Sequence, residues 1–264
     1  YWQFDDEYYD GCYYFYGPDG KMAHGWIEWN GKWYYLSEFD WGRMYVDQPV
    51  YNEDDTWTYH VGEDGAMITN GWGYCGDGQY CYYGADGKKV TGWIQLKGKW
   101  YYLNPEDGVA FKNNMFETKG EWDYLNYDCE MVTNYWLWTQ DEMSWYYFGP
   151  DGKQYTGWLQ QNGKWYYLDP LCKRSIKFDW NGSRYFFVAD GHMVTNYWLK
   201  LSDKRHYYYG ADGKEYSGWQ KVDGEWYYFI PENANKKASH GYELDYKGYH
   251  YVFDDEGHYT ETKI

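Results

Sequence analysis

Aromatic side chains recur in groups of three along this sequence, and these groups are the residues best suited to bind a ligand. In the first group, Trp26, Trp33 and Tyr35 surround Glu28, and the polar residue changes from group to group. Rings around a variable polar residue form a candidate recognition surface, since Trp and Tyr offer large apolar faces with polar tips. The same rings are equally suited to packing against a neighbouring segment, so both roles stay open. The other groups are Trp93, Trp100 and Tyr102; Trp158, Trp165 and Tyr167; and Trp219, Trp226 and Tyr228.

Each group lies in a predicted β-hairpin. In the first, Asn30-Gly31 separates two aromatic runs, and this dipeptide favours a type I′ turn with positive φ at both central residues. The turn fixes the register and places Trp26 opposite Tyr35. Because side chains alternate between faces along a strand, the three rings share one face of the hairpin. The opposite face is expected to form core between hairpins and carries Ile27, Trp29, Tyr34 and Leu36.

The hairpins belong to a longer internal repeat. A Gly-Trp pair opens the regular hairpin of each repeat, and a Met-x-Thr-Asn segment recurs in phase with it at Met67, Met131 and Met193. A repeat of about 64 residues has room for three hairpins, which is a period typical of repeat proteins. The sequence therefore predicts one all-β domain over residues 1–264, a solenoid of stacked β-hairpins. Its predicted units span 17–83, 84–148, 149–209 and 210–264, and residues 1–16 are interpreted as the tail of a preceding unit.

Charge and composition exclude several classes of partner. The chain has 24 basic and 41 acidic residues and a net charge of −17, which argues against nucleic acid because phosphate binding needs clustered Lys and Arg. This charge serves solubility or, alternatively, attracts cationic ligands. The sequence has no run of about 18 apolar residues, so no membrane span is predicted. A chain that opens at Tyr1 rather than Met is expected to be a mature or excised fragment.

Sequence motifs of catalytic and metal sites are missing, so no catalytic residue, metal site or cofactor is predicted. There is no Gly-x-Ser-x-Gly nucleophile elbow, phosphate-binding loop, dinucleotide fingerprint or His-Glu-x-x-His. The acidic clusters Glu53-Asp54-Asp55 and Asp254-Asp255-Glu256 lack EF-hand spacing and are expected in solvated loops. A glycosidase needs only two nearby carboxylates, but the repeats account for almost every residue. The chain is therefore predicted not to be an enzyme.

The chain has five cysteines, so at least one is unpaired within a monomer. Cys75 and Cys81 flank the segment 76–80 and would face each other across a hairpin. The other interpretation is five incidental buried thiols. The sequence leaves this pairing open, as it does the oligomeric state.

The regular hairpin resembles a known repeat. Gly157-Trp158 is followed by Gly163-Lys164-Trp165-Tyr166-Tyr167, and joining turns read Asp19-Gly20-Lys21-Met22 and Gly65-Ala66-Met67. This pattern resembles the cell-wall-binding repeat superfamily of Gram-positive bacteria. That superfamily includes choline-binding modules, the glucan-binding repeats of glucosyltransferases and the C-terminal repeats of clostridial toxins. The resemblance implies stacked hairpins with ligands between neighbours. It implies choline held by rings of two adjacent repeats beside a Met, or sugars stacked on the rings.

The sequence thus predicts a non-catalytic binding module of a secreted or cell-surface protein. Its expected partner is a cell-wall or extracellular polysaccharide, bound through the twelve Trp and Tyr residues of the four groups. A choline-bearing teichoic-acid polymer is the second hypothesis, because Gly-Trp and Trp-Tyr-Tyr recur fully in only one hairpin of three and Tyr259 takes the Met place in the last unit. A rigid stalk or protein-binding adhesin segment is the third.

Overall fold

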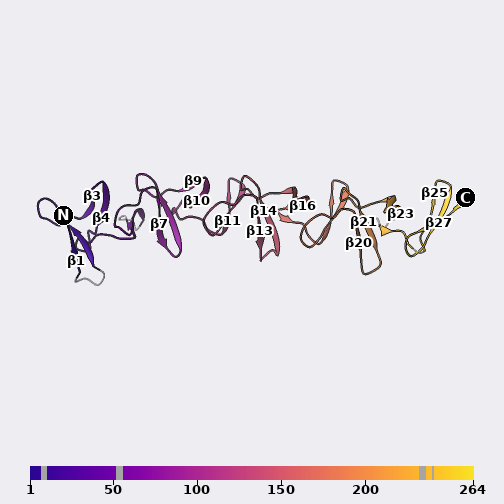
Figure 1. The fold of residues 1–264 in the computed structure, drawn as a ribbon, viewed down its shortest axis with the longest axis horizontal. Coiled ribbons are helices and arrows are strands. Elements are labelled where there is room, and N and C mark those ends of the chain that lie inside the picture. Colours follow the sequence, from indigo (N-terminus) through magenta and orange to yellow (C-terminus); the bar gives the residue numbers. More distant parts are fainter. Residues whose placement is uncertain (7–10, 52–55, 232–235, 240) are drawn as a thin grey trace. The chain divides into compact units, whose positions relative to one another are not determined.

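A computed structural model describes residues 1–6, 11–51, 56–231, 236–239 and 241–264 of the chain. The acidic cluster predicted at Glu53-Asp54-Asp55 lies outside the described residues, as do residues 232–235 and 240 of the predicted last unit. The described chain contains consecutive antiparallel β-hairpins (Figure 1), which confirms the predicted fold class. Among the described residues, no helix is long and apolar enough to cross a membrane.

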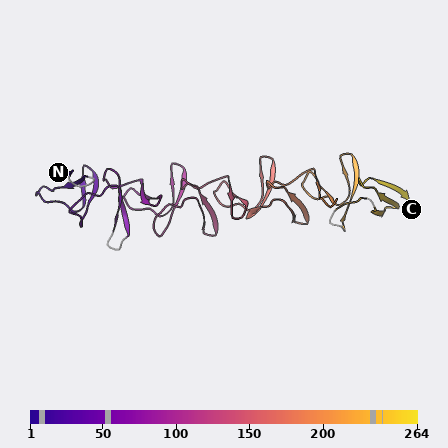
Figure 2. The same cartoon turned by 90° about the horizontal axis from the view of Figure 1, so that it is seen from below.

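The chain divides into two compact units. The first contains residues 1–134 together with 150–153, and the second contains 135–149 together with 154–264. Within each unit the hairpins follow one another in chain order (Figures 1 and 2). The strands of the first unit are β1 (Trp2–Asp5), β2 (Cys12–Phe15), β3 (Gly25–Trp29), β4 (Lys32–Leu36), β5 (Gln48–Tyr51), β6 (Trp57–Val61), β7 (Gly71–Gly76), β8 (Gln79–Tyr83), β9 (Gly92–Leu96), β10 (Lys99–Leu103), β11 (Asn114–Thr118) and β12 (Glu121–Leu125).

The second unit repeats this pattern, and three of its hairpins have a third strand, which is two residues long in β17 and β24 and five in β27. Its strands are β13 (Tyr135–Thr139), β14 (Ser144–Phe148), β15 (Gly157–Gln161), β16 (Lys164–Asp169), β17 (Leu171–Cys172), β18 (Ile176–Trp180), β19 (Ser183–Phe187), β20 (Tyr197–Lys200), β21 (His206–Tyr209), β22 (Gly218–Val222), β23 (Glu225–Ile230), β24 (Lys236–Lys237), β25 (Glu243–Tyr246), β26 (Tyr249–Phe253) and β27 (Tyr259–Lys263).

The register of the regular hairpins is the predicted one. Trp26 lies opposite Tyr35 in β3–β4, and Trp158 lies opposite Tyr167 in β15–β16. The turn between β3 and β4 has φ of 52° at Asn30 and 74° at Gly31, as a type I′ turn requires. Two further hairpins separate β3–β4 from β9–β10, so three hairpins make up one repeat.

The linkers between hairpins tie neighbouring hairpins together. Met67 pairs with Val61 at the end of β6, and its backbone N–H donates to the carbonyl of Trp33 on β4, one hairpin earlier, at 2.7 Å. We call the position of Met67 in the linker the bridging position, and the residue there the bridging residue. Each bridging residue therefore satisfies backbone groups of two successive hairpins. The same two contacts are made by Met44, Lys89, Ala110, Met131, Met193 and Glu215.

The core has one fully buried residue near the end of the second strand in every described hairpin after β1–β2. Leu36, Leu103, Leu168 and Phe229 are each 0 % exposed in the regular hairpins. Burying such a side chain stabilises the fold by about 1.5–3 kcal/mol, so these residues hold the array together along with the rings. In the other hairpins the same place is taken by Val61, Tyr83, Leu125, Phe148, Phe187, Tyr209 and Phe253.

Each face of a regular hairpin meets a different neighbour. On the face of the three predicted rings, Trp26 contacts Tyr59 of the following hairpin, with ring centres 5.2 Å apart. On the opposite face, Tyr34 contacts Trp2 of the preceding hairpin, also at 5.2 Å. The prediction of one core face was therefore incomplete, because both faces pack and Leu36 alone among the residues assigned to the core face is fully buried.

Candidate functional site

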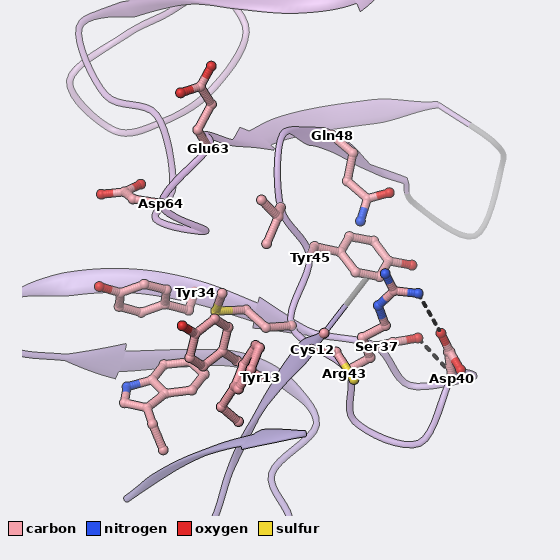
Figure 3. Close-up of a pocket in the computed structure, with 15 residues that line it drawn as sticks. Cys12, Tyr13, Tyr34, Ser37, Asp40, Arg43, Tyr45, Gln48, Glu63 and Asp64 are labelled. Carbon is pink, nitrogen blue, oxygen red and sulfur yellow. Dashed lines mark hydrogen bonds and ion pairs between the residues drawn. The ribbon is translucent and has the colours of Figure 1, made fainter. Parts of the chain in front are cut away.

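A cavity of about 960 Å³ opens between the first two hairpins (Figure 3). Trp2 on β1 and Tyr13 on β2 line it from one hairpin, and Tyr34 on β4 lines it from the next. The bridging residue Met44 completes the lining. We call these four residues the first cage. Its place follows from the fold, because the ring face of one hairpin looks onto the opposite face of its successor.

The rings of the first cage stand at steep angles to one another. The ring centres of Trp2 and Tyr13 are 6.5 Å apart with an interplanar angle of 87°, and those of Trp2 and Tyr34 are 5.2 Å apart at 69°. The backbone N–H of Met44 donates to the carbonyl of Tyr13 at 2.9 Å, and Met44 lines the cavity together with the rings. Tyr13 is 44 % exposed, which leaves this ring accessible to a ligand.

Three carboxylates line this cavity, and two of them have a cation beside them. Asp40, Glu63 and Asp64 line it, and Arg43 is the cation among the lining residues (Figure 3). Arg43 lies 3.9 Å from Asp40. The hydrogen bond from Lys32 at 2.7 Å lowers the pKa of the Asp64 carboxyl below its usual range, so Asp64 stays ionised. Negative ring faces and ionised carboxylates together favour a cationic ligand with apolar substituents.

The same four places recur at other junctions between hairpins. The first position is a Trp on the first strand, the second is a ring on the second strand, the third is a ring of the next hairpin, and the fourth is the bridging residue. In one copy, Trp158 lies 6.3 Å from Trp165 at 81° and 5.0 Å from Tyr185. In the described part of the chain, complete sets are also formed by Trp26, Trp33, Tyr59 and Met67, and by Trp219, Trp226, Tyr251 and Tyr259.

The predicted Trp residues occupy the first and second cage positions. Trp33, Trp100, Trp165 and Trp226 at the second position are 38–46 % exposed. The predicted Tyr residues lie behind the first-position Trp, as Tyr35 does 5.2 Å from Trp26. Three equivalent pairs are Trp93 with Tyr102, Trp158 with Tyr167 and Trp219 with Tyr228. These four Tyr residues support a cage ring and are not at any of the four positions.

Sequence reasoning missed the first cage itself. Trp2 and Tyr13 fall in residues 1–16, which were set aside as a tail, and Tyr34 was assigned to the core face. A usable signal was present, because Tyr13-Tyr14-Phe15-Tyr16 repeats the pattern of Trp33-Tyr34-Tyr35-Leu36. The recurrent Met residues also marked the fourth position, although nothing in one hairpin shows which rings they meet.

Not every junction has a complete set. Trp93 and Trp100 face Asp123 at the third position, where the other sets have Tyr. Asp123 is fully buried and pairs with Lys153 at 2.8 Å. Trp72 contacts Tyr101 at 5.2 Å, but Ala110 takes the fourth position there. Among the described residues, no group of His, Cys, Asp and Glu is arranged to hold a metal ion.

Family models match all four regular hairpins. A model described as "Choline-binding repeat" matches residues 76–116 and 138–171. A second, described as "Putative cell wall binding repeat", matches residues 24–44 and 217–231. The matched segments contain the predicted Trp residues at the first and second cage positions.

Similar repeats form part of larger proteins. Glucosyltransferase-S of Streptococcus mutans is 26 % identical over 255 residues, which is 92 % of this chain and 16 % of that protein. Glucosyltransferase-I of Streptococcus downei is 27 % identical over 244 residues, covering 86 % of this chain and 14 % of that protein. The chain thus spans about a sixth or less of the length of these relatives.

Solved structures share the fold over nearly the whole chain. CbpJ from Streptococcus pneumoniae superposes with a TM-score of 0.60 at 21 % identity, covering 98 % of this chain and 100 % of CbpJ, which is a likeness of fold. Choline binding protein F from Streptococcus pneumoniae gives a TM-score of 0.56 at 25 % identity, covering 98 % of each chain. The repeat matches, the hairpin fold and the recurring cage positions agree, and the chain is similar to choline-binding and cell wall binding repeats.

Proposed function

We propose that this chain is the module that attaches a secreted or cell-surface protein of a Gram-positive bacterium to a choline-bearing wall polymer. The observation that carries the proposal is the first cage, in which two rings of one hairpin, a ring of the next and a Met border a cavity of about 960 Å³. The family descriptions "Choline-binding repeat" and "choline binding protein F" support the same ligand. In this proposal the chain itself performs no chemistry.

The cage geometry favours choline over the glycan that sequence reasoning ranked first. A sugar ring stacks on a flat platform and needs hydrogen-bond partners for its hydroxyls. A quaternary ammonium is compact and is best surrounded on several sides by ring faces, each worth about 0.5–2 kcal/mol. Trp2 makes interplanar angles of 87° with Tyr13 and 69° with Tyr34, so the rings face different directions, as surrounding a quaternary ammonium requires. Lys32 and Arg43 offset the charges of Asp64 and Asp40, so Glu63 supplies the remaining negative charge beside the cavity.

Several modest sites on one chain explain firm attachment to a polymer. Each complete cage in the described residues offers a separate site, and a wall polymer presents many choline groups. Once one cage is occupied, the next binding event is intramolecular, so overall avidity exceeds the affinity of any one site by about 10²–10⁴-fold where the geometry permits.

The test is a titration with choline, followed by Trp fluorescence and calorimetry. The matched neutral compound is 3,3-dimethylbutan-1-ol, which has the same shape without the charge. We expect saturable binding of choline and much weaker binding of the neutral compound. A Tyr13→Ala and Tyr34→Ala double variant should lose the first-cage site while the other cages still bind. Equal binding of both compounds, or none, would refute the proposal.

A glucan polymer is the second candidate function, favoured by one observation. The match to Glucosyltransferase-S extends over 92 % of this chain, so the similarity includes the irregular hairpins. A pull-down separates the two candidates: choline-containing walls and insoluble α-glucan are offered in parallel, with free choline as competitor. Retention on α-glucan that choline does not release would support the glucan function.

A further inference from the structure

A lysine stands at the fourth position of the junction between β20–β21 and β22–β23. Lys237 on β24 pairs with Phe229, as Met44 pairs with Leu36 in the first cage. Trp198 takes the first position of this junction and Tyr227 the third, with ring centres 5.3 Å apart. The first and third rings of a cage are therefore present, with His206 at the second position. The residue at the fourth position is a cation where four other linkers carry Met.

The stem of this lysine follows the path of the Met side chains. At Gly213 an added methyl would lie 2.5 Å from the Sδ of Met193, and at Gly257 it would lie 3.1 Å from the Cδ of Lys237. Each glycine lies one hairpin later than its bridging residue, and both glycines have positive φ. Lys237 is thus a bridging residue whose stem occupies the Met site and whose ammonium extends further.

The ammonium of Lys237 reaches the rings. Its Nζ lies 5.6 Å from the ring centre of Trp198 and 5.5 Å from that of Tyr227, within the range of cation–π attraction. It also donates a hydrogen bond to the backbone carbonyl of Glu256 at 2.6 Å. Lys237 is 8 % exposed, and this burial lowers its pKa. An incoming cation would have to displace this group or lie against it.

We propose that Lys237 is a built-in occupant of its cage. The chain's own ammonium takes the place of the ligand's, so this junction is closed to choline, whereas those with Met44, Met67 and Met193 are open. This inference deepens the proposed function and rests on it. It divides the junctions into ligand-binding ones and a self-filled one that holds its hairpins together without a ligand.

The test restores the family residue. Lys237→Met should raise the number of choline sites per chain by one in equilibrium dialysis with radiolabelled choline. Lys236→Met, on the same strand, is the matched control and should leave the number unchanged. Near-UV circular dichroism confirms that both variants fold. An unchanged site number in folded Lys237→Met would overturn the inference.

A second measurement does not depend on choline. Ring currents should move the Cε protons of Lys237 upfield of those of Lys236 in NMR spectra of lysine-labelled protein, with Lys237→Met providing the assignment. Equal shifts for the two lysines would overturn the placement of the ammonium on the rings. If wild-type protein bound no choline at all, the proposed function would fail, while these shifts would still decide whether Lys237 fills its cage.

A different observation concerns the hairpin β7–β8. The Sγ atoms of Cys75 and Cys81 lie 2.6 Å apart, within a hairpin whose register shifts between Tyr74 and Gly76. Hydrogen bonding with Cys81 lowers the pKa of the Cys75 thiol, which makes Cys75 the better nucleophile of the two. Cys75 is half-buried, whereas Cys81, Cys12, Cys129 and Cys172 are buried, so Cys75 is also the more accessible thiol.

We infer that Cys75 and Cys81 form a disulfide when a small-molecule disulfide is present. The Cys75 thiolate attacks a sulfur of the oxidant and releases one thiol, and the Cys81 thiolate then attacks the mixed disulfide and releases the second. The two cysteines lose two electrons and two protons, and the oxidant becomes two thiols. The product is a covalent link across the hairpin that carries Trp72.

Incubation with oxidised glutathione followed by peptide mass mapping tests this link. The peptide containing both residues should become lighter by two hydrogens, whereas Cys75→Ser should stop at a glutathione adduct or stay reduced. Cys129→Ser is the control and should still form the link. Alkylation of both Cys75 and Cys81 after oxidant treatment would overturn the inference.

Discussion

Two consecutive junctions of the second unit use the same hairpin in opposite ways. On one side of β18–β19, Trp158, Trp165, Tyr185 and Met193 form a complete ring set. On the other side, the first, second and fourth positions hold charged residues in place of rings and Met. The occupants of that second set are Lys177, Arg184, Tyr207 and Glu215.

The charged junction is a buried ion network. The Glu215 side chain is fully buried, lies 3.1 Å from the Nζ of Lys177 and accepts a hydrogen bond from the Tyr209 hydroxyl at 2.9 Å. The Nζ of Lys177 also lies 3.0 Å from the ring centre of Tyr207. Burial lowers the pKa of Lys177 and raises that of Tyr209. The same backbone scaffold therefore carries a ring set at one junction and an ion network at the next, and four side chains make the difference.

The largest expected effect is a loss of unfolding free energy when the carboxylate of the charged junction is removed. Glu215→Ala leaves the half-buried Lys177 without its carboxylate, and breaking a buried pair in this way costs about 3–5 kcal/mol. Urea unfolding measures the loss. Asp212→Ala in the same linker, whose partner Lys214 is exposed, should have little effect. A Lys177→Met and Glu215→Met double variant should recover most of the stability. If Glu215→Ala were as stable as Asp212→Ala, the network would not stabilise the junction.

A glycine pair probes the Met of the ring junction. Gly213 and Gly163 both have φ of 76°, so replacing either by Ala costs about 1–2 kcal/mol of backbone strain. At Gly213 the new methyl would lie 2.5 Å from the Sδ of Met193, whereas nothing lies within 4 Å at Gly163. Gly213→Ala should therefore lose about 1–3 kcal/mol more in urea unfolding and also weaken choline binding. Equal losses would mean that Met193 moves aside freely.

The exposed Trp of the ring junction should affect binding rather than folding. Trp165 is 38 % exposed and offers one ring to the ligand. Trp165→Ala should remove about 0.5–2 kcal/mol of cation–π attraction, or about 2- to 30-fold in affinity at that site. Calorimetric titration with choline gives the affinity, and urea unfolding checks the fold. Tyr246→Ala, which removes an exposed ring outside the ring sets, is the comparison. An unfolded Trp165→Ala would support a structural role for this ring.

The smallest expected effect concerns an exposed ion pair of the same hairpin. Arg184 donates hydrogen bonds to Asp179 at 2.7 and 3.2 Å, which lowers the pKa of Asp179. The contribution of this pair to stability is present above the unfolded pKa of about 3.9 and is lost as the pH falls through the lower folded value. Because Asp179 is mostly exposed, Asp179→Asn should flatten the acid limb of the stability profile only slightly. A large change would show that Asp179 also stabilises Glu215 through Arg184.

Local features of the fold were predictable because they depend on local chemistry. Asn30-Gly31 and its counterparts set the turn, and the turn sets which residues face each other, so the regular hairpins follow from sequence. The cages do not follow, because Tyr34 and Met44 reach the rings of Trp2 and Tyr13 from a later hairpin and its linker. No local pattern states how one hairpin rotates onto the next.

The sequence-based ranking of a glycan before choline also depended on local motifs alone. The full motif is confined to the regular hairpins, which suggested few choline sites and favoured a glycan. The structure shows that Tyr59 and Tyr185, in irregular hairpins, supply the third ring. Lys237 and Glu215 could not be recognised as counterparts of Met, because in the irregular linkers the backbone pairing alone reveals the correspondence.

The bridging linkers also imply a rule of growth for such chains. Because each bridging residue is bonded to the two hairpins before it, a duplicated hairpin arrives with the backbone partners it needs and creates one new junction. Under the proposed function, evolution can therefore add one ligand-binding junction by duplicating a hairpin, or remove one by replacing a Met with a Lys. Under the proposed function, the affinity of the chain for its polymer would then depend on the number of ligand-binding junctions, and it could change in small steps without redesign of any one site.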